Sequence, residues 1–372
     1  MIDEQDIKSG DKVRVGITHG DYNSISYEII LKTFQDIRIL DFFTPIIYGS
    51  SKIASYFRKT LNIPDVNLNL IKKADYANPK RVNIVNCFED EVKIEVGKMS
   101  RMAGELSYYA LEKAVEDIRT NKIDVLVTGP INKKNIQSDK FGFSGHTDYL
   151  AHKFNTDNHL MMMVSNNLRI GILTGHIPLS AVREKITKEL VLNKIRVMCE
   201  SLKNDFNTTK PKIAILGLNP HAGDDGLIGS EEKDIISPAI EMAKKENFLA
   251  FGPFPADGFF GSLSYMKYDG VLAMYHDQGM IPFKAIAFDE GVNYTAGLPV
   301  VRTSPAHGTA FDIAGKNIAS EASIREAIYL GIQIFKNRKL NSELNKNPLP
   351  LKITEEQPQH NEQNSEDKDL KE

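Results

Sequence analysis

Three histidines each follow a short apolar run that is typical of a buried strand. They are His176, His221 and His276, in a chain of 372 residues. Open α/β sheets gather their ligands at the carboxyl ends of strands, so these three imidazoles could converge. Three imidazole ligands form a transition-metal site in which one position remains open for substrate. Each histidine could instead be an ordinary core or loop residue, and their wide spacing along the chain leaves that alternative open.

Three polar side chains downstream of the last histidine could bind an anion. Lys284, Asn293 and Arg302 offer an ammonium, an amide and a guanidinium, and Gly and Pro residues between them favour turns. Lysine and arginine on loops beside a strand end are suited to phosphate or carboxylate. The alternative is a set of solvated surface cations.

Two further segments could contact a ligand. His146 and Thr147 follow a Gly turn at the predicted start of a helix, where free N–H groups favour anions. The segment 307–315 has Gly near both ends, which allows close approach of a ligand but also suits a tight turn. The sequence contains no Gly-x-Gly-x-x-Gly and no Gly-x-x-x-x-Gly-Lys, so the standard dinucleotide and phosphate-loop motifs are excluded.

Alternation of short apolar runs with amphipathic segments predicts an α/β protein with a mostly parallel sheet. Residues 160–164 and 168–173 predict a local antiparallel hairpin, which makes the sheet mixed. The polar loop 18–24 is either a ligand contact or a plain connection. The last helix is expected at 323–336, and the polar, acidic segment 341–372 is expected to be disordered.

Composition and charge exclude several classes of protein. A formal net charge of -3 gives no reason to expect nucleic acid as a partner. The two cysteines, Cys87 and Cys199, form no paired motif, which favours a reducing compartment. The acidic N-terminus does not resemble a signal peptide, and no apolar run approaches the roughly 20 residues of a membrane helix. We therefore expect a cytoplasmic protein without a membrane partner.

Several motifs occur in an order that resembles one enzyme family. These are Gly16-Ile-Thr, Thr128-Gly-Pro-Ile-Asn-Lys133, Gly145-His-Thr, His176-Ile-Pro-Leu, Gly217-Leu-Asn-Pro-His-Ala-Gly223, Tyr275-His-Asp-Gln-Gly279, Gly297-Leu-Pro and Arg302-Thr-Ser. The chain resembles the 4-hydroxythreonine-4-phosphate dehydrogenases of pyridoxal phosphate biosynthesis over roughly residues 13–335. The segment from His307 to Gly315 also resembles the cofactor loop of isopropylmalate dehydrogenases, which bind NAD without the standard fingerprint.

The resemblance implies an oxidoreductase of two α/β/α lobes, with mostly parallel mixed sheets and an active site in the cleft between them. The lobes would comprise residues 12–134 with 303–340, and residues 135–302. The enzyme would use NAD or NADP to oxidise the 3-hydroxyl of 4-(phosphooxy)-L-threonine, and loss of CO2 would give 3-amino-2-oxopropyl phosphate.

The resemblance also implies roles for individual residues. The metal ligands would be His176, His221 and His276, contributed across the interface of a homodimer to Zn²⁺, Mg²⁺ or Co²⁺. The substrate would be held by His146, Thr147, Lys284, Asn293 and Arg302. The catalytic residues would be His146, Asp257 and Lys284. The cofactor would contact His307, Gly308, Asp312 and Gly315.

Two departures from the family pattern leave the substrate and cofactor open. The first loop reads Asp21-Tyr-Asn-Ser-Ile-Ser-Tyr27 where the family has Gly and Pro, and Ala306 stands where Asp is common. The same chemistry on threonate or erythronate 4-phosphate is therefore a close alternative. A metal-dependent phosphatase is less favoured, because three histidines supply no bridging carboxylate. A non-catalytic metal-binding module would leave Lys284, Asn293 and Arg302 unexplained.

Overall fold

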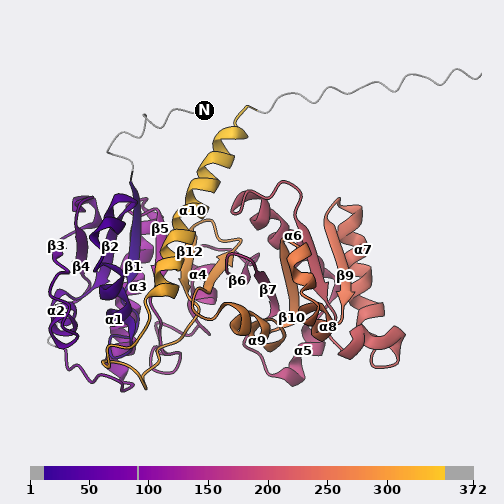
Figure 1. Ribbon diagram of the computed structural model, residues 1–372, viewed down its shortest axis with the longest axis horizontal. Helices are drawn as coiled ribbons and strands as arrows, with labels where there is room; N and C mark the ends of the chain where they lie inside the picture. The colour runs from indigo at the N-terminus through magenta and orange to yellow at the C-terminus, as the bar shows by residue number, and fades with distance from the viewer. Residues whose placement is uncertain (1–11, 90–91, 348–372) are drawn as a thin grey trace, which may run out of the picture.

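The computed structural model describes residues 12–89 and 92–347, which contain one twelve-stranded sheet (Figure 1). The strand order is β3-β4-β2-β1-β5-β12-β11-β6-β7-β10-β8-β9. In chain order, the strands are β1 Val13–Thr18, β2 Phe43–Gly49, β3 Leu68–Ile71, β4 Val82–Asn86, β5 Val125–Thr128, β6 Leu160–Val164, β7 Arg169–Thr174, β8 Lys212–Leu216, β9 Leu249–Phe254, β10 Gly270–Tyr275, β11 Val292–Ala296 and β12 Val301–Pro305. Most pairs are parallel, whereas β11 is antiparallel to β12 and β6, and β6 is antiparallel to β7. The predicted mixed α/β sheet and its hairpin are confirmed.

Helices cover both faces of the sheet. They are α1 Ser26–Thr33, α2 Ser51–Thr60, α3 Arg101–Arg119, α4 His146–Lys153, α5 Leu179–Lys185, α6 Lys188–Asn204, α7 Ser237–Lys245, α8 Ala256–Gly261, α9 His276–Ala287 and α10 Ala322–Leu344. Side-chain caps define where several of these helices begin. The hydroxyl oxygens of Ser50, Ser100 and Thr187 each accept a hydrogen bond from the backbone amide three residues later in the chain. None of the described helices is long and apolar enough to cross a membrane.

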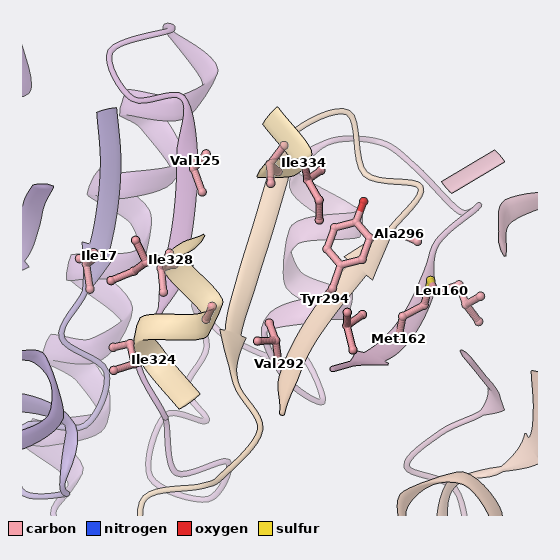
Figure 2. Close-up of a cluster of buried hydrophobic side chains, with 14 of the residues drawn as sticks. Ile17, Val125, Leu160, Met162, Val292, Tyr294, Ala296, Ile324, Ile328 and Ile334 are labelled. Carbon is pink, nitrogen blue, oxygen red and sulfur yellow. The ribbon is translucent and has the colours of Figure 1, made fainter. Parts of the chain in front are cut away.

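The apolar core differs between the two faces of the sheet. On one face a single large cluster runs beneath α1, α2, α6 and α10. Figure 2 shows part of it, where Val292 and Tyr294 lie between Met162 and the α10 side chains. On the other face the core is divided into two clusters. One lies beneath α3 and α4, and the other beneath α8 and α9. The strands between these two clusters are free to carry polar side chains.

Three site residues lie on regular elements rather than on the loops that were predicted. Lys284 is in α9, Asn293 is in β11 and Arg302 is in β12. Pro282, a residue type that usually ends or kinks a helix, lies inside α9, which packs closely on β7 and β10. Gly279 makes this packing possible, because a Cβ there would lie 2.5 Å from the Ile172 side chain.

Two other sequence boundaries also change. The segment 251–257, where two prolines favour a loop, instead forms the end of strand β9 and the start of helix α8. Helix α10 runs to Leu344, beyond the predicted end, because Asn341 donates to the Asn204 carbonyl at 2.9 Å and to Asn207 Oδ1 at 3.0 Å. The rest of the tail that was expected to be disordered, 348–372, lies outside the described residues. The lobe boundaries remain a prediction; strands of the two proposed lobes meet where β12 pairs with β11.

Candidate functional site

A polar cavity of about 250 Å³ lies on the face of the sheet where the core is divided. Its walls come from the segment after β5, the start of α4, strands β6, β11 and β12, and helix α9. It brings together His146, Thr147, His176, His276, Lys284, Asn293, Arg302, His307 and Gly308, which are nine of the predicted site residues. The cavity therefore collects residues that are up to 180 positions apart in the sequence, such as Thr128 and Gly308.

Arg302 lines this cavity and is almost fully buried. Its Nε and Nη2 donate to Thr128 Oγ1 at 3.1 and 2.6 Å, and Nη1 donates to Thr295 Oγ1 at 3.3 Å. A guanidinium has five N–H donors, so these bonds leave donors available for a ligand. Burial lowers the pKa of Arg302, and no described acidic residue is an ion-pair partner to offset that cost. A buried cation with free donors and no counter-charge is suited to bind an anionic ligand.

His146 begins α4 beside Arg302, and its Nε2 is buried without a hydrogen-bond partner among the described residues. Burial lowers the pKa of His146 well below its usual value, and the positive charges of Arg302 and Lys133 lower it further. The ring is therefore neutral at pH 7 and can accept a proton. The start of α4 also directs free backbone N–H groups toward the cavity, where they favour an anion.

His176 and His276 face each other across one edge of the cavity, with ring centroids 5.6 Å apart. Their proximity follows from parallel pairing of β7 with β10, in which Thr174 is level with Tyr275. The carboxylate of Asp277 lies 2.7 Å from Nδ1 of His276. An ionised carboxylate only accepts, so Nδ1 donates and Nε2 keeps a lone pair for a metal.

His221 lies elsewhere, in a second cavity that does not include the other two histidines. Within the described part of a single chain, no three His, Cys, Asp or Glu residues are placed to hold one metal ion. Two imidazoles thus fit a metal at the first cavity, and a third ligand would come from outside this chain. The three-histidine site stays a prediction.

The turn that carries His221 is left-handed. Consecutive φ values are 53° at His221, 51° at Ala222, 84° at Gly223, 44° at Asp224 and 54° at Asp225. This conformation costs about 1–2 kcal/mol for each residue that has a Cβ. His176 also has a positive φ, of 46°. Strained backbone that the surrounding structure maintains is a feature of functional sites.

The predicted cofactor residues divide into two groups. His307 and Gly308 line the cavity, and Nε2 of His307 is buried without a partner among the described residues. A Cβ at Gly308 would meet nothing within 4 Å, so there is room beside it for a ligand. These features fit a cofactor approaching along the loop. Asp312 and Gly315 lie farther along and do not line the cavity.

Asp257, the remaining predicted site residue, is exposed on α8 and does not line the cavity of this chain. Its catalytic role stays a prediction.

Sequence reasoning missed three contributors. Lys133 lines the cavity, and burial lowers its pKa although Asp148 partly offsets this effect. Thr128 and Thr295 orient Arg302 from β5 and β11, the two strands that flank β12. Thr128 and Lys133 bracket the motif Thr-Gly-Pro-Ile-Asn-Lys directly after a strand, which was the available signal. No comparable sequence signal marks Thr295.

Comparisons with known proteins identify the relatives of this chain. The family model described as pyridoxal phosphate biosynthetic protein PdxA matches residues 41–331. A 4-hydroxythreonine-4-phosphate dehydrogenase from Bacteroides thetaiotaomicron is 51% identical over 339 residues, covering 91% of this chain and 93% of the relative. A provisionally named D-threonate 4-phosphate dehydrogenase from Oceanobacillus iheyensis is 36% identical, covering 86% of this chain and 97% of that protein.

A crystal structure is similar across nearly the whole fold. The 4-hydroxythreonine-4-phosphate dehydrogenase from Klebsiella pneumoniae superposes with a TM-score of 0.75 at 30% identity, covering 88% of this chain and 99% of that one.

Proposed function

The chain belongs to the pyridoxal phosphate biosynthetic protein PdxA family of dehydrogenases, and we propose that it oxidises 4-(phosphooxy)-L-threonine at its 3-hydroxyl. The β-keto acid formed would lose CO2 to give 3-amino-2-oxopropyl phosphate. One observation carries the proposal: the buried Arg302 guanidinium has free donors and no acidic partner among the described residues, in a cavity that also holds two facing histidines.

The phosphate would bind between Arg302 and the start of α4. Arg302 is held by two threonine hydroxyls, so its remaining donors are fixed before the substrate arrives. The backbone N–H groups at His146 and Thr147 would supply further donors. Lys284 and Asn293 extend this polar wall, and the unpartnered Oδ1 of Asn293 would accept from a substrate hydroxyl or ammonium.

His146 is our choice for the group that takes the proton of the 3-hydroxyl. It is neutral, and its Nε2 is free in the cavity. When bound, the nicotinamide accepts the hydride and a divalent metal acidifies the substrate hydroxyl. His176 and His276 would hold that metal together with His221 of the partner subunit in a homodimer. Catalytic contributions of Lys284 and Asp257 belong to the same proposal.

NAD or NADP would bind beside His307 and Gly308 and continue toward Asp312 and Gly315. We also infer a cytoplasmic enzyme, because neither Cys87 nor Cys199 forms a disulfide. The metal would be Zn²⁺, Mg²⁺ or Co²⁺, and elemental analysis of the purified enzyme would identify it.

The competing substrate is D-threonate 4-phosphate, which carries a hydroxyl in place of the ammonium group. Asp148 is the acidic side chain among the residues that line the cavity, and it would pair with an ammonium. This observation favours the amino-acid phosphate over threonate or erythronate 4-phosphate.

Full-length protein should therefore be assayed with NAD or NADP, divalent metal and each of the phosphorylated acids. We expect reduced cofactor to form fastest from 4-(phosphooxy)-L-threonine, and Asp148→Asn to reduce that preference. Faster turnover of threonate 4-phosphate would overturn the substrate assignment. Phosphate release without cofactor reduction would support the phosphatase, and metal uptake without turnover of any substrate would support the binding module.

The metal site has its own test. His221→Ala should remove bound metal and activity while the thermal unfolding midpoint of the metal-free protein stays near that of the wild type. Unchanged metal content, measured by elemental analysis after dialysis, would contradict the three-histidine site.

A further inference from the structure

Hydrogen bonds outside the cavity connect the three segments that carry His176, His221 and His276. None of the residues that form these bonds is among the predicted ligands. The three segments follow β7, β8 and β10, which are adjacent parallel strands, so they lie at the same end of the sheet. The first link starts from Gln278, two residues after His276. Its Nε2 donates to the Gly217 carbonyl at 2.6 Å, and its Oε1 accepts from the Met274 amide at 2.7 Å. The end of β8 is thereby fixed to the start of α9.

The second link is a buried carboxylate beneath the left-handed turn. Glu232 is only 4% exposed, and its Oε1 accepts from the backbone amides of Leu218 and Asn219, each at 2.7 Å. Its Oε2 accepts from Nδ2 of Asn219 at 2.9 Å. The turn packs directly on this group, because a Cβ at Gly223 would lie 2.6 Å from Oε2. Glu232 is therefore hydrogen-bonded to the residues that precede the turn and packs against Gly223 in its middle.

The third link continues to the segment after His176. Asn219 Nδ2 also donates to Glu231 Oε2 at 2.8 Å, and Glu231 accepts in turn from Nε of Arg183 in α5. Helix α5 begins three residues after His176. The series Arg183, Glu231, Asn219, Glu232 thus connects the His176 segment to the His221 turn, and Gln278 connects that turn to His276.

We propose that Glu232, acting through Asn219, is a positioning residue that keeps the His221 turn in its left-handed conformation before any ligand binds. A turn of this kind is unfavourable for residues with a Cβ, so it needs contacts that maintain it. Three hydrogen bonds to a buried carboxylate supply them. The consequence for metal affinity rests on the proposed function, whereas the conformational consequence does not.

The test uses full-length, metal-free protein and four variants, of which Asn219→Ala is the comparison if Glu232→Ala does not fold. Glu232→Ala removes all three acceptor contacts. Glu232→Gln retains the Oε1 acceptor for the two backbone amides and should recover most of the wild-type behaviour. Asp205→Asn is the matched control, because Asp205, directly after α6, is a buried carboxylate away from the turn that accepts from Ser201 of α6 at 2.6 Å and from Arg338 of α10 at 2.6 Å.

Two measurements are made on each variant: hydrogen exchange of the amides in 217–229, and affinity for Co²⁺ followed by its visible absorption. We expect Glu232→Ala to speed exchange in 217–229 and to weaken Co²⁺ binding by about ten- to a hundredfold. Asp205→Asn should lower the thermal midpoint without changing either quantity.

Unchanged exchange in 217–229 for Glu232→Ala would overturn the proposal, as would an equal loss of Co²⁺ affinity in Asp205→Asn. If Glu232→Ala does not fold, Glu232→Gln must still exchange more slowly in 217–229 than Asn219→Ala, and the reverse order would also overturn it. If wild-type protein binds no Co²⁺, the proposed metal site fails, and the exchange data alone decide whether Glu232 positions the turn.

Discussion

Two arginines lie on opposite faces of β11 in opposite circumstances: Arg302 is almost fully buried, and Arg338 is half-buried. On one face, Thr295 helps to hold Arg302, which forms no ion pair with a described acidic residue. On the other face, Tyr294 accepts from Arg338 at 2.9 Å, and Arg338 also pairs with the buried Asp205 at 2.6 Å. Successive strand residues point to opposite faces, so this difference arises within one residue of sequence.

The comparison separates charged groups that find their partners within the protein from charged groups that are left to bind a ligand. Arg338 belongs to a closed network whose charges compensate one another, and that network joins α10 to the end of α6. Arg302 has only hydroxyl partners. No described acidic residue offsets the free-energy cost of burying its positive charge. Both guanidinium groups are at least partly buried, so the missing counter-charge of Arg302 is the sign of function.

The largest expected effect comes from removing each guanidinium in turn. Arg302→Met should lower kcat/KM about a thousandfold, since it removes a buried charge contact to the phosphate. Its unfolding free energy should stay near the wild-type value, because no buried acid loses a partner. Arg338→Met should instead lower the unfolding free energy by about 3–5 kcal/mol, because Asp205 would remain buried and unpaired.

Steady-state kinetics and denaturant unfolding of both variants provide the measurement. The folded fraction of Arg338→Met should retain near-normal kcat/KM at low temperature. A similar loss of activity in both variants, or a similar loss of stability, would remove the distinction between the two faces.

A second pair of residues sharpens the same distinction for neutral groups. His19 and His146 both have buried ring nitrogens without partners among the described residues. His146 lines the cavity, whereas His19 is enclosed by aromatic rings and stacks on Tyr27 with centroids 5.5 Å apart. Burial lowers the pKa of His19 to about 4. An unpartnered nitrogen therefore marks a ligand site only where a cavity reaches it.

His19 should make stability depend on pH without affecting catalysis. Its folded pKa is about 4, against 6.5 when unfolded, so below pH 6.5 the unfolded chain binds a proton that the folded chain does not. The contribution of neutral His19 to the free energy of unfolding is therefore complete above pH 6.5. It is lost as the pH falls toward 4, by about 3 kcal/mol in total.

His19→Phe keeps the ring stack and should flatten this dependence. Unfolding free energies of the wild type and the variant, measured between pH 4 and 7.5, should diverge as the pH falls, with the variant more stable. His152→Gln, on the surface of α4, serves as control and should follow the wild type. Parallel curves for wild type and His19→Phe would show that the enclosed ring is protonated as readily in the folded state.

Local sequence patterns predicted the parts of the site that follow from strand periodicity. Residues directly after apolar runs, such as His176 and His276, lie where parallel pairing of β7 and β10 places them. Residue types and neighbouring turns also singled out Arg302 and His146, the resemblance to a family assigned them to the substrate, and the cavity brings them together. The direction of the His221 turn was not predictable, because nothing in Asn-Pro-His-Ala-Gly-Asp-Asp announces a left-handed conformation at residues that have a Cβ.

Long-range contacts account for the other failures. Pro282 lies within a helix because packing of α9 on β7 and β10 overrides its local preference for a turn. The polar loop after β1 could have met a ligand, yet its side chains are buried, and those other than His19 are hydrogen-bonded to protein. Asp21 accepts from the Asn23 amide at 2.9 Å and from Asn135 at 2.7 Å. Asn135 is far away in the sequence, so no local pattern could have identified it.

The smallest expected effect tests whether the cavity acts as one electrostatic unit. Lys133 is a positive neighbour that lowers the pKa of both His146 and His176. Lys133→Gln removes that charge, so the protonated form of His146 becomes less unfavourable and its pKa rises. The acidic limb of the kcat–pH profile, where protonation of His146 stops turnover, should move to higher pH by less than about one unit. Lys134→Gln, one residue farther along and exposed, should leave the profile unchanged. A shift to lower pH, or an equal shift in both variants, would mean that another group controls the limb and that His146 is as electrostatically isolated as His19.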